Sequence, residues 1–194
     1  MWTLLLSLAL AAPPGFEPVG EGAGCQLFRG PVHADGTQPI RAECHWPDVA
    51  PRRLEGLLTR FDRLDELIPP VVRSEIVRTE GPRALVHQVA QVRGIAPRQV
   101  LVWMERTASD GAVRVSWVTA SGERLDLLPR HVRAPRNDGA WEVAPHPDGG
   151  SRVVHEVTYD PGGSVPAWVV RWAQAGGLRD VMETVRAAAS RPGG

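Results

Sequence analysis

The sequence predicts an α+β fold in which an antiparallel sheet faces a long carboxy-terminal helix. A series of strand-like segments in the middle of the chain is joined by connections too short for crossover helices, which indicates an antiparallel meander. Asp110-Gly111 and Asp148-Gly149 are typical hairpin turns between such segments. With 194 residues, the chain fits one domain that buries enough surface to fold without a metal.

The first part of this fold is predicted to be a hairpin followed by two short helices. Within residues 38–46, apolar and polar side chains alternate with the period of a half-buried strand. Asp48 is expected to cap the first helix, with Pro51 in its first turn. Apolar residues recur at helical spacing up to Pro69-Pro70, which ends the pair. The two helices are therefore expected after the second strand.

The second part is the meander and the last helix. The expected strands are residues 71–78, 83–93, 98–107, 112–119, 131–133, 140–146 and 151–159. Ser164 is expected to cap the last helix, with Pro166 near its start and an apolar stripe running from Trp168 to Val185. Gly176-Gly177 is expected to bend that helix midway. A twisted sheet facing such a helix leaves a concave interior, which could be hollow or filled.

The charge pattern excludes several classes of function. Every one of the 22 basic residues is arginine, so a lysine Schiff base, a pyridoxal phosphate enzyme and a Walker P-loop are excluded. The 22 acidic residues bring the net charge to zero, which leaves no electrostatic footprint for nucleic acid. We therefore expect no nucleic-acid partner.

The amino terminus differs from the rest of the chain. Residues 1–12 are apolar and uncharged, and Ala9-Leu10-Ala11 supplies the small-x-small pattern that a signal peptidase accepts. We expect a short signal peptide over 1–12, a flexible leader over 13–24 and the folded domain over 25–190, in a periplasmic or secreted protein. No arginine precedes the apolar stretch, and a misassigned start or a buried amino-terminal strand is the alternative.

The two cysteines also bear on whether the protein is exported. Cys25 and Cys44 flank a turn-like stretch at 34–37, so a hairpin would bring them within about two residues of opposition on neighbouring strands. A disulfide is then possible, and an oxidising compartment would favour it. A pair of buried free thiols is the alternative. Without a CxxC spacing, the two cysteines form no zinc site.

Reactive side chains give no strong motif. The six histidines are scattered without metal-binding spacing, and we expect no metal, no cofactor and no catalytic group. Ser164 lacks the second glycine of a nucleophile elbow. Catalysis would require a cavity acid or base such as His87, His155 or Glu156. The seven tryptophans carry more information, because large aromatic side chains either line a hydrophobic cavity or fill a core.

One stretch resembles a known family. Residues 160–168, DPGGSVPAW, together with residues 139–143 and the strand ending at Tyr159, are similar to the carboxy-terminal signature of bacterial START-related lipid-binding proteins. Ala96-Pro97-Arg98 is similar to the family's proline turn and arginine at the start of a strand. Gln99 and Arg171 depart from the family pattern. The resemblance implies the helix-grip fold of the SRPBCC superfamily, in which a curved antiparallel sheet wraps around the final helix.

The resemblance also implies a function. We expect non-catalytic binding or transport of a lipid or other hydrophobic small molecule in an internal cavity, by a monomer with transient membrane contact. The alternatives are a polyketide cyclase-like or hydrolase-like enzyme acting on a bulky apolar substrate, and a packed module with no ligand. Arg98 and Arg114 could offer a polar handle. The expected ligand-binding residues are Arg98, Val102, Trp103, Val115, Trp117, Trp141, Val157, Trp168 and Trp172.

Overall fold

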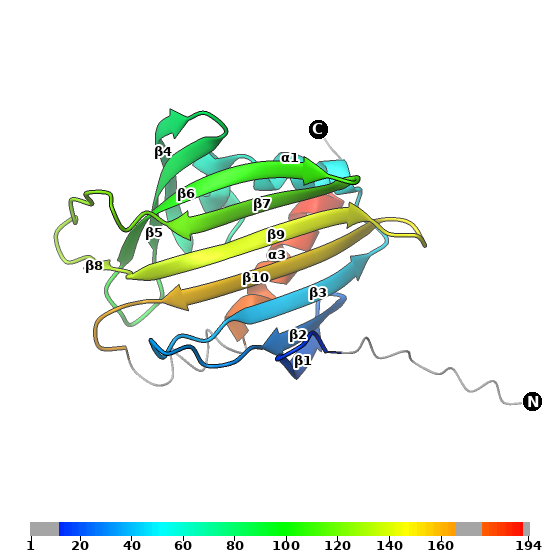
Figure 1. Cartoon of the computed structure of the whole chain (residues 1–194), viewed down its shortest axis with the longest axis horizontal. Helices are drawn as coiled ribbons and strands as arrows, with labels where there is room; N and C mark the ends of the chain where they lie inside the picture. Colours follow the sequence, from blue (N-terminus) through cyan, green and yellow to red (C-terminus); the bar gives the residue numbers. More distant parts are fainter. Residues whose placement is uncertain (1–11, 166–175, 192–194) are drawn as a thin grey trace, which may run out of the picture.

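The computed structural model describes residues 12–165 and 176–191 and confirms the predicted α+β fold. A curved antiparallel sheet carries its helices on one face (Figure 1). The strands in the described residues are β1 (Glu17–Gly22), β2 (Cys25–Arg29), β3 (Ile40–Trp46), β4 (Val71–Glu80), β5 (Arg83–Ala90), β6 (Arg98–Ser109), β7 (Ala112–Thr119), β8 (Val132–Arg133), β9 (Arg136–Pro145) and β10 (Ser151–Asp160). The helices are α1 (Pro51–Leu58), the 3-10 helix η1 (Phe61–Glu66) and α3 (Leu178–Ser190).

The sheet brings together strands from distant parts of the sequence. Its strand order is β1-β2-β3-β10-β9-β7-β6-β5-β4, so the last strand, β10, lies between β3 and β9. The neighbours along this path are antiparallel, as the short connections predict. The short strand β8 pairs in parallel with β6 and lies off this path.

The amino-terminal edge corrects one expectation. Residues 17–22 of the expected flexible leader form β1, which pairs with β2 through a turn at Ala23-Gly24. Both turn residues have positive φ, 57° and 75°. Most of the side chains of β1 are exposed, so the segment shows no apolar alternation and its pairing comes from β2 alone. The two helices consequently follow the third strand, not the second.

The two cysteines lie directly opposite each other. Cys25 pairs with Cys44 in the register of β2 and β3, and their sulfur atoms form a disulfide. Both residues are buried in the main core. The bond fastens β2 to the strand that pairs with β10.

The helices are held by apolar contacts and by one polar pair that the sequence analysis misassigned. Asp48 does not cap α1, whose N-cap is Ala50 in an extended conformation with no side-chain hydrogen bond. The Asp48 carboxylate instead accepts hydrogen bonds from Arg186 (2.8 Å) and Ser190 (3.0 Å) of α3. It therefore ties the start of the helical pair to the end of the last helix.

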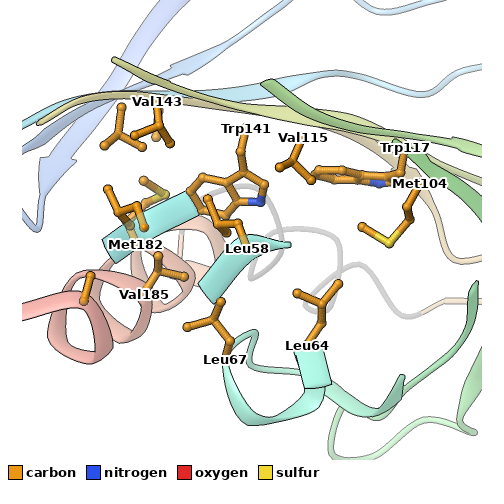
Figure 2. Packing of buried hydrophobic residues seen from close by; sticks show 14 of the residues in the cluster. Leu58, Leu64, Leu67, Met104, Val115, Trp117, Trp141, Val143, Met182 and Val185 are labelled. Carbon is orange, nitrogen blue, oxygen red and sulfur yellow. The ribbon is translucent and has the colours of Figure 1, made fainter. Parts of the chain in front are cut away.

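The described part of the last helix packs one apolar stripe against the sheet. Leu178, Met182, Val185 and Ala189 are buried at helical spacing, and Figure 2 shows Met182 and Val185 beside the inner side chains of β9. The start of the expected helix, with Pro166, Trp168 and Trp172, lies outside the described residues. No helix among residues 12–165 and 176–191 is long and apolar enough to cross a bilayer.

Candidate functional site: a cavity beneath the curved sheet

The space between the sheet and its helices is hollow. A cavity of about 550 Å³ opens there, within the usual size range of small-molecule sites. Figure 2 shows Trp117 and Met104 extending from the sheet toward Leu64 of η1, with Trp141 beside them. Other apolar members of the lining are Ile40, Leu58, Ile68, Val71, Val92, Ile95, Val115, Val157, Leu178 and Val181. The interior is therefore mainly apolar.

The structure brings most of the described candidate residues together. Arg98, Val115, Trp117, Trp141 and Val157 all line the cavity. They come from β6, β7, β9 and β10, whose inner faces share the same concave surface.

Two predicted site residues are elsewhere. Val102 is fully buried in the core and does not line the cavity. Trp103 lies on the outer face, where it packs on Leu85 and Leu101. Because adjacent residues of a strand point to opposite faces, Val102 and Trp103 could not both have faced inward.

Arg98 lines the cavity, but its side chain donates its hydrogen bonds to backbone carbonyl oxygens. Its side chain, in a residue only 5% exposed, donates to the carbonyl oxygens of Ala96, Pro161 (3.3 Å) and Gly162 (3.5 Å). The last two belong to the turn after β10, where Gly162 and Gly163 both have φ of 63°. Arg98 thus clamps the turn that leaves the sheet.

The other arginine considered as a polar handle faces solvent. Arg114 is exposed and forms an ion pair with Glu142 of the neighbouring strand β9. Its guanidinium therefore lies on the outer surface of the sheet, and Arg114 does not line the cavity.

His155 is the imidazole that the structure places in the cavity. It is 5% exposed and stacks on Trp141 with ring centroids 3.8 Å apart, and the Trp117 ring centroid lies 5.9 Å from its own. Its Nδ1 lies 3.3 Å from the carbonyl oxygen of Ala140. Burial lowers the pKa of His155 to about 4, so the ring is neutral at pH 7.

The other two proposed acid–base candidates lie on the outer face. His87 contacts the side-chain amide of Gln99 at 3.0 Å, and burial lowers its pKa. Glu156 accepts a hydrogen bond from Arg41 at 2.8 Å. Neither residue lines the cavity, so of the three acid–base candidates His155 alone lies there.

A polar network crosses one wall of the cavity. The Trp117 indole N–H donates to the side-chain oxygen of Asn137 (3.0 Å), and the Asn137 amide donates to Gln88 (3.4 Å). Gly139 makes this arrangement possible, because a Cβ atom at that position would lie 2.5 Å from the Trp117 ring. The network therefore gives the Trp117 N–H and the side-chain oxygens of Asn137 and Gln88 partners within the protein.

The loop between β2 and β3 borders the cavity and is pinned by charge. Asp35 and Thr37 line the cavity, and Arg136 of β9 donates to both, at 3.0 and 3.2 Å. The Asp35 carboxylate also accepts hydrogen bonds from the backbone and hydroxyl of Thr37. The Thr37 contacts, more than Arg136, lower the pKa of Asp35 to about 2, so it stays ionised.

Tyr159 is a cavity residue that the sequence analysis did not select. It lines the cavity two positions beyond Val157, and burial raises the pKa of its hydroxyl to about 12. His155, Val157 and Tyr159 share one face of β10 because side chains on a strand alternate with a period of two. Since Val157 was expected in the cavity, the same period predicts that His155 and Tyr159 also point into it.

Comparison with protein families identifies the chain. Residues 41–190 match the model of the family described as polyketide cyclase/dehydrase and lipid transport. The chain belongs to this family, and the resemblance seen in the sequence is confirmed. No curated protein matches the sequence.

Solved structures confirm the START-like helix-grip fold. The STAR-related lipid transfer protein of Xanthomonas axonopodis superposes with a TM-score of 0.78 at 20% identity, over 91% of this chain and 99% of that one. Human STARD10 gives 0.79 at 16% identity, over 92% and 74%. The di-domain ARO/CYC protein BexL gives 0.55 at 14% identity, over 81% and 51%. At these identities the comparison establishes the fold alone.

The clamp formed by Arg98 predicts a stability difference between two arginines. Arg98→Gln should lower the free energy of unfolding by about 2 kcal/mol, because buried carbonyl oxygens lose charged donors. Arg114→Gln, which breaks an exposed ion pair, should cost less than about 1 kcal/mol. Urea unfolding of the two variants measures both values. Equal costs would show that Arg98 does not hold the turn.

The neutral imidazole predicts a pH dependence of stability. Because the folded pKa of His155 is about 4, below an unfolded value of 6.5, the unfolded chain takes up a proton first as pH falls. Stability should drop by about 2 kcal/mol between pH 7.5 and 5 from this residue alone. Urea unfolding at both pH values measures the drop, and His155→Phe should remove it. An unchanged pH dependence in the variant would contradict the assignment.

Proposed function

We propose that this protein binds, and carries without chemical change, a lipid or another hydrophobic small molecule in the cavity beneath the sheet. The observation that supports this most is the lining itself: a mainly apolar cavity of about 550 Å³ whose charged groups already have protein partners. Arg98 is bound to carbonyl oxygens, and the carboxylates of Asp35 and Asp160 accept hydrogen bonds from Thr37 and Gly162. A charged ligand group would have to displace these contacts.

Apolar burial would supply most of the affinity. Each square ångström of apolar surface removed from water contributes roughly 25 cal/mol, before the cost of immobilising the ligand. Two proteins of similar structure, the one from Xanthomonas axonopodis and the human StAR-related lipid transfer protein 5, are named as lipid transfer proteins, which agrees with a cavity of this kind. The family description includes lipid transport as well.

The same family description includes cyclases, and catalysis is the alternative. A general base works best when its pKa lies near the working pH, whereas His155 has a pKa of about 4. Among the described residues, no carboxylate hydrogen-bonds to His155 to orient it or raise its basicity. These features favour binding over proton transfer.

Filling the cavity predicts a loss of binding. Val157→Trp adds a large ring to a side chain that already points into the cavity, so affinity for the neutral fluorescent probe N-phenyl-1-naphthylamine should fall at least about tenfold. Fluorescence titration measures the affinity, and mass spectrometry of the released probe checks that it is unchanged.

Val118→Trp is the matched control. Val118 lies on the outer face of β7 and is 55% exposed, so the same substitution there should leave probe affinity unaltered. Equal affinities for both variants and the parent would place the probe outside the cavity and overturn the proposal.

Export of the chain is part of the proposal. The apolar segment 1–12 and the disulfide between Cys25 and Cys44 support a periplasmic or secreted location, because disulfides persist in oxidising compartments. Protein recovered from its own host should begin near Ala12 or Pro13 and should show no free thiol when it is denatured. A recovered chain that starts at Met1 with two free thiols would refute export.

A further inference from the structure

The hydrogen bond made by His155 determines which of its nitrogens can meet a ligand. A carbonyl oxygen only accepts, so the 3.3 Å contact with Ala140 requires Nδ1 to carry the proton. A neutral imidazole then has a lone pair on Nε2, which makes that nitrogen an acceptor. Nε2 has no hydrogen-bond partner among the described residues.

The neighbouring tryptophan offers the complementary group. Trp141 is 4% exposed and lies nearly parallel to His155, at an angle of 14°. Its indole N–H, unlike that of Trp117, has no acceptor within the described part of the chain. In that part, no fully buried side-chain nitrogen or oxygen lacks a partner, so both free nitrogens open into the cavity.

We propose that His155 and Trp141 hold a hydroxyl group of the ligand inside the apolar cavity. The hydroxyl donates to Nε2 of His155 and accepts from Nε1 of Trp141, a pairing that fits the one donor and two lone pairs of an alcohol. This inference rests on the proposed function and specifies its ligand as a neutral, hydrophobic alcohol.

Ionised ligands fit these two residues less well. A carboxylate is an acceptor only, and it would face the lone pair of His155 in a setting of low polarity. The surrounding lining from Met104, Val115 and Trp117 supplies no free cation. Arg98 is already bound to backbone carbonyls.

Three ligands of equal chain length test the proposal: 1-decanol, its methyl ether and decanoate, each used to displace N-phenyl-1-naphthylamine. The ether keeps the acceptor oxygen but cannot donate to His155, so we expect decanol to bind about tenfold more tightly. Decanoate should bind more weakly than decanol as well. Equal affinity for decanol and its ether overturns the proposal without any variant.

Substitutions identify the residues responsible. His155→Phe keeps an aromatic ring in the stack and removes the acceptor, so the preference for decanol over the ether should disappear while ether affinity stays within about twofold. Trp141→Phe should weaken the binding of decanol and of its ether alike, because both oxygens accept from Nε1, and should leave the preference for decanol largely unchanged. His87→Phe, on the outer face, is the matched control and should retain it.

The possible outcomes separate the two proposals. If decanol and the ether bind the parent equally while Val157→Trp still weakens probe binding, the cavity binds ligands but selects no hydroxyl. A preference that survives in His155→Phe overturns the assigned residue. If neither the probe nor any decyl compound binds the parent, the proposed function fails and this inference fails with it.

Discussion

The pairing of β10 with β3 on one side and β9 on the other is the interaction on which the rest of the structure depends. It joins the amino-terminal hairpin to the meander and makes one continuous curved sheet from two segments far apart in the sequence. Three inward side chains of β10 form part of the cavity, and β9 sets Trp141 directly opposite His155. The disulfide holds β2 to β3, and Arg98 fixes the turn after β10. Both strands of the β3–β10 pair are therefore held by a further contact.

Several arginines of this protein hold separate segments together through hydrogen bonds to backbone carbonyl oxygens and carboxylates. Arg98 clamps a turn, Arg136 pins the loop that borders the cavity, and Arg186 connects α3 to the start of α1 through Asp48. A planar guanidinium with several fixed donors can bind two or three acceptors at once, which an ammonium group does with less directionality. These three guanidinium groups hold segments in place, and the charged side chains that do line the cavity are bound to protein partners.

Sequence patterns located the strands wherever one face meets water and the other meets the core. β7 has the predicted bounds because the Asp110-Gly111 turn fixes its start, with φ of 52° and 78°, and its residues alternate afterwards. In β6 the outer face is also covered, by Leu85, Ala120 and Leu125, so its apolar run has no alternation to show that Trp103 points outward. The tautomer of His155 depends on a contact with Ala140, which only the folded register supplies.

The cavity lies between a packed part of the core and a tryptophan ring that is held in place. Figure 2 shows Val143, Met182 and Val185 packed beside Trp141. These three core residues do not line the cavity. Toward the other end, Trp117 is held in place by Asn137 and lies over Gly139, where any side chain would collide with its ring. Leu64 faces it from η1 and Met104 lies beside it on the sheet. A polar network that fixes an indole therefore keeps an apolar space from collapsing, because the ring cannot move to fill it without breaking its own hydrogen bond.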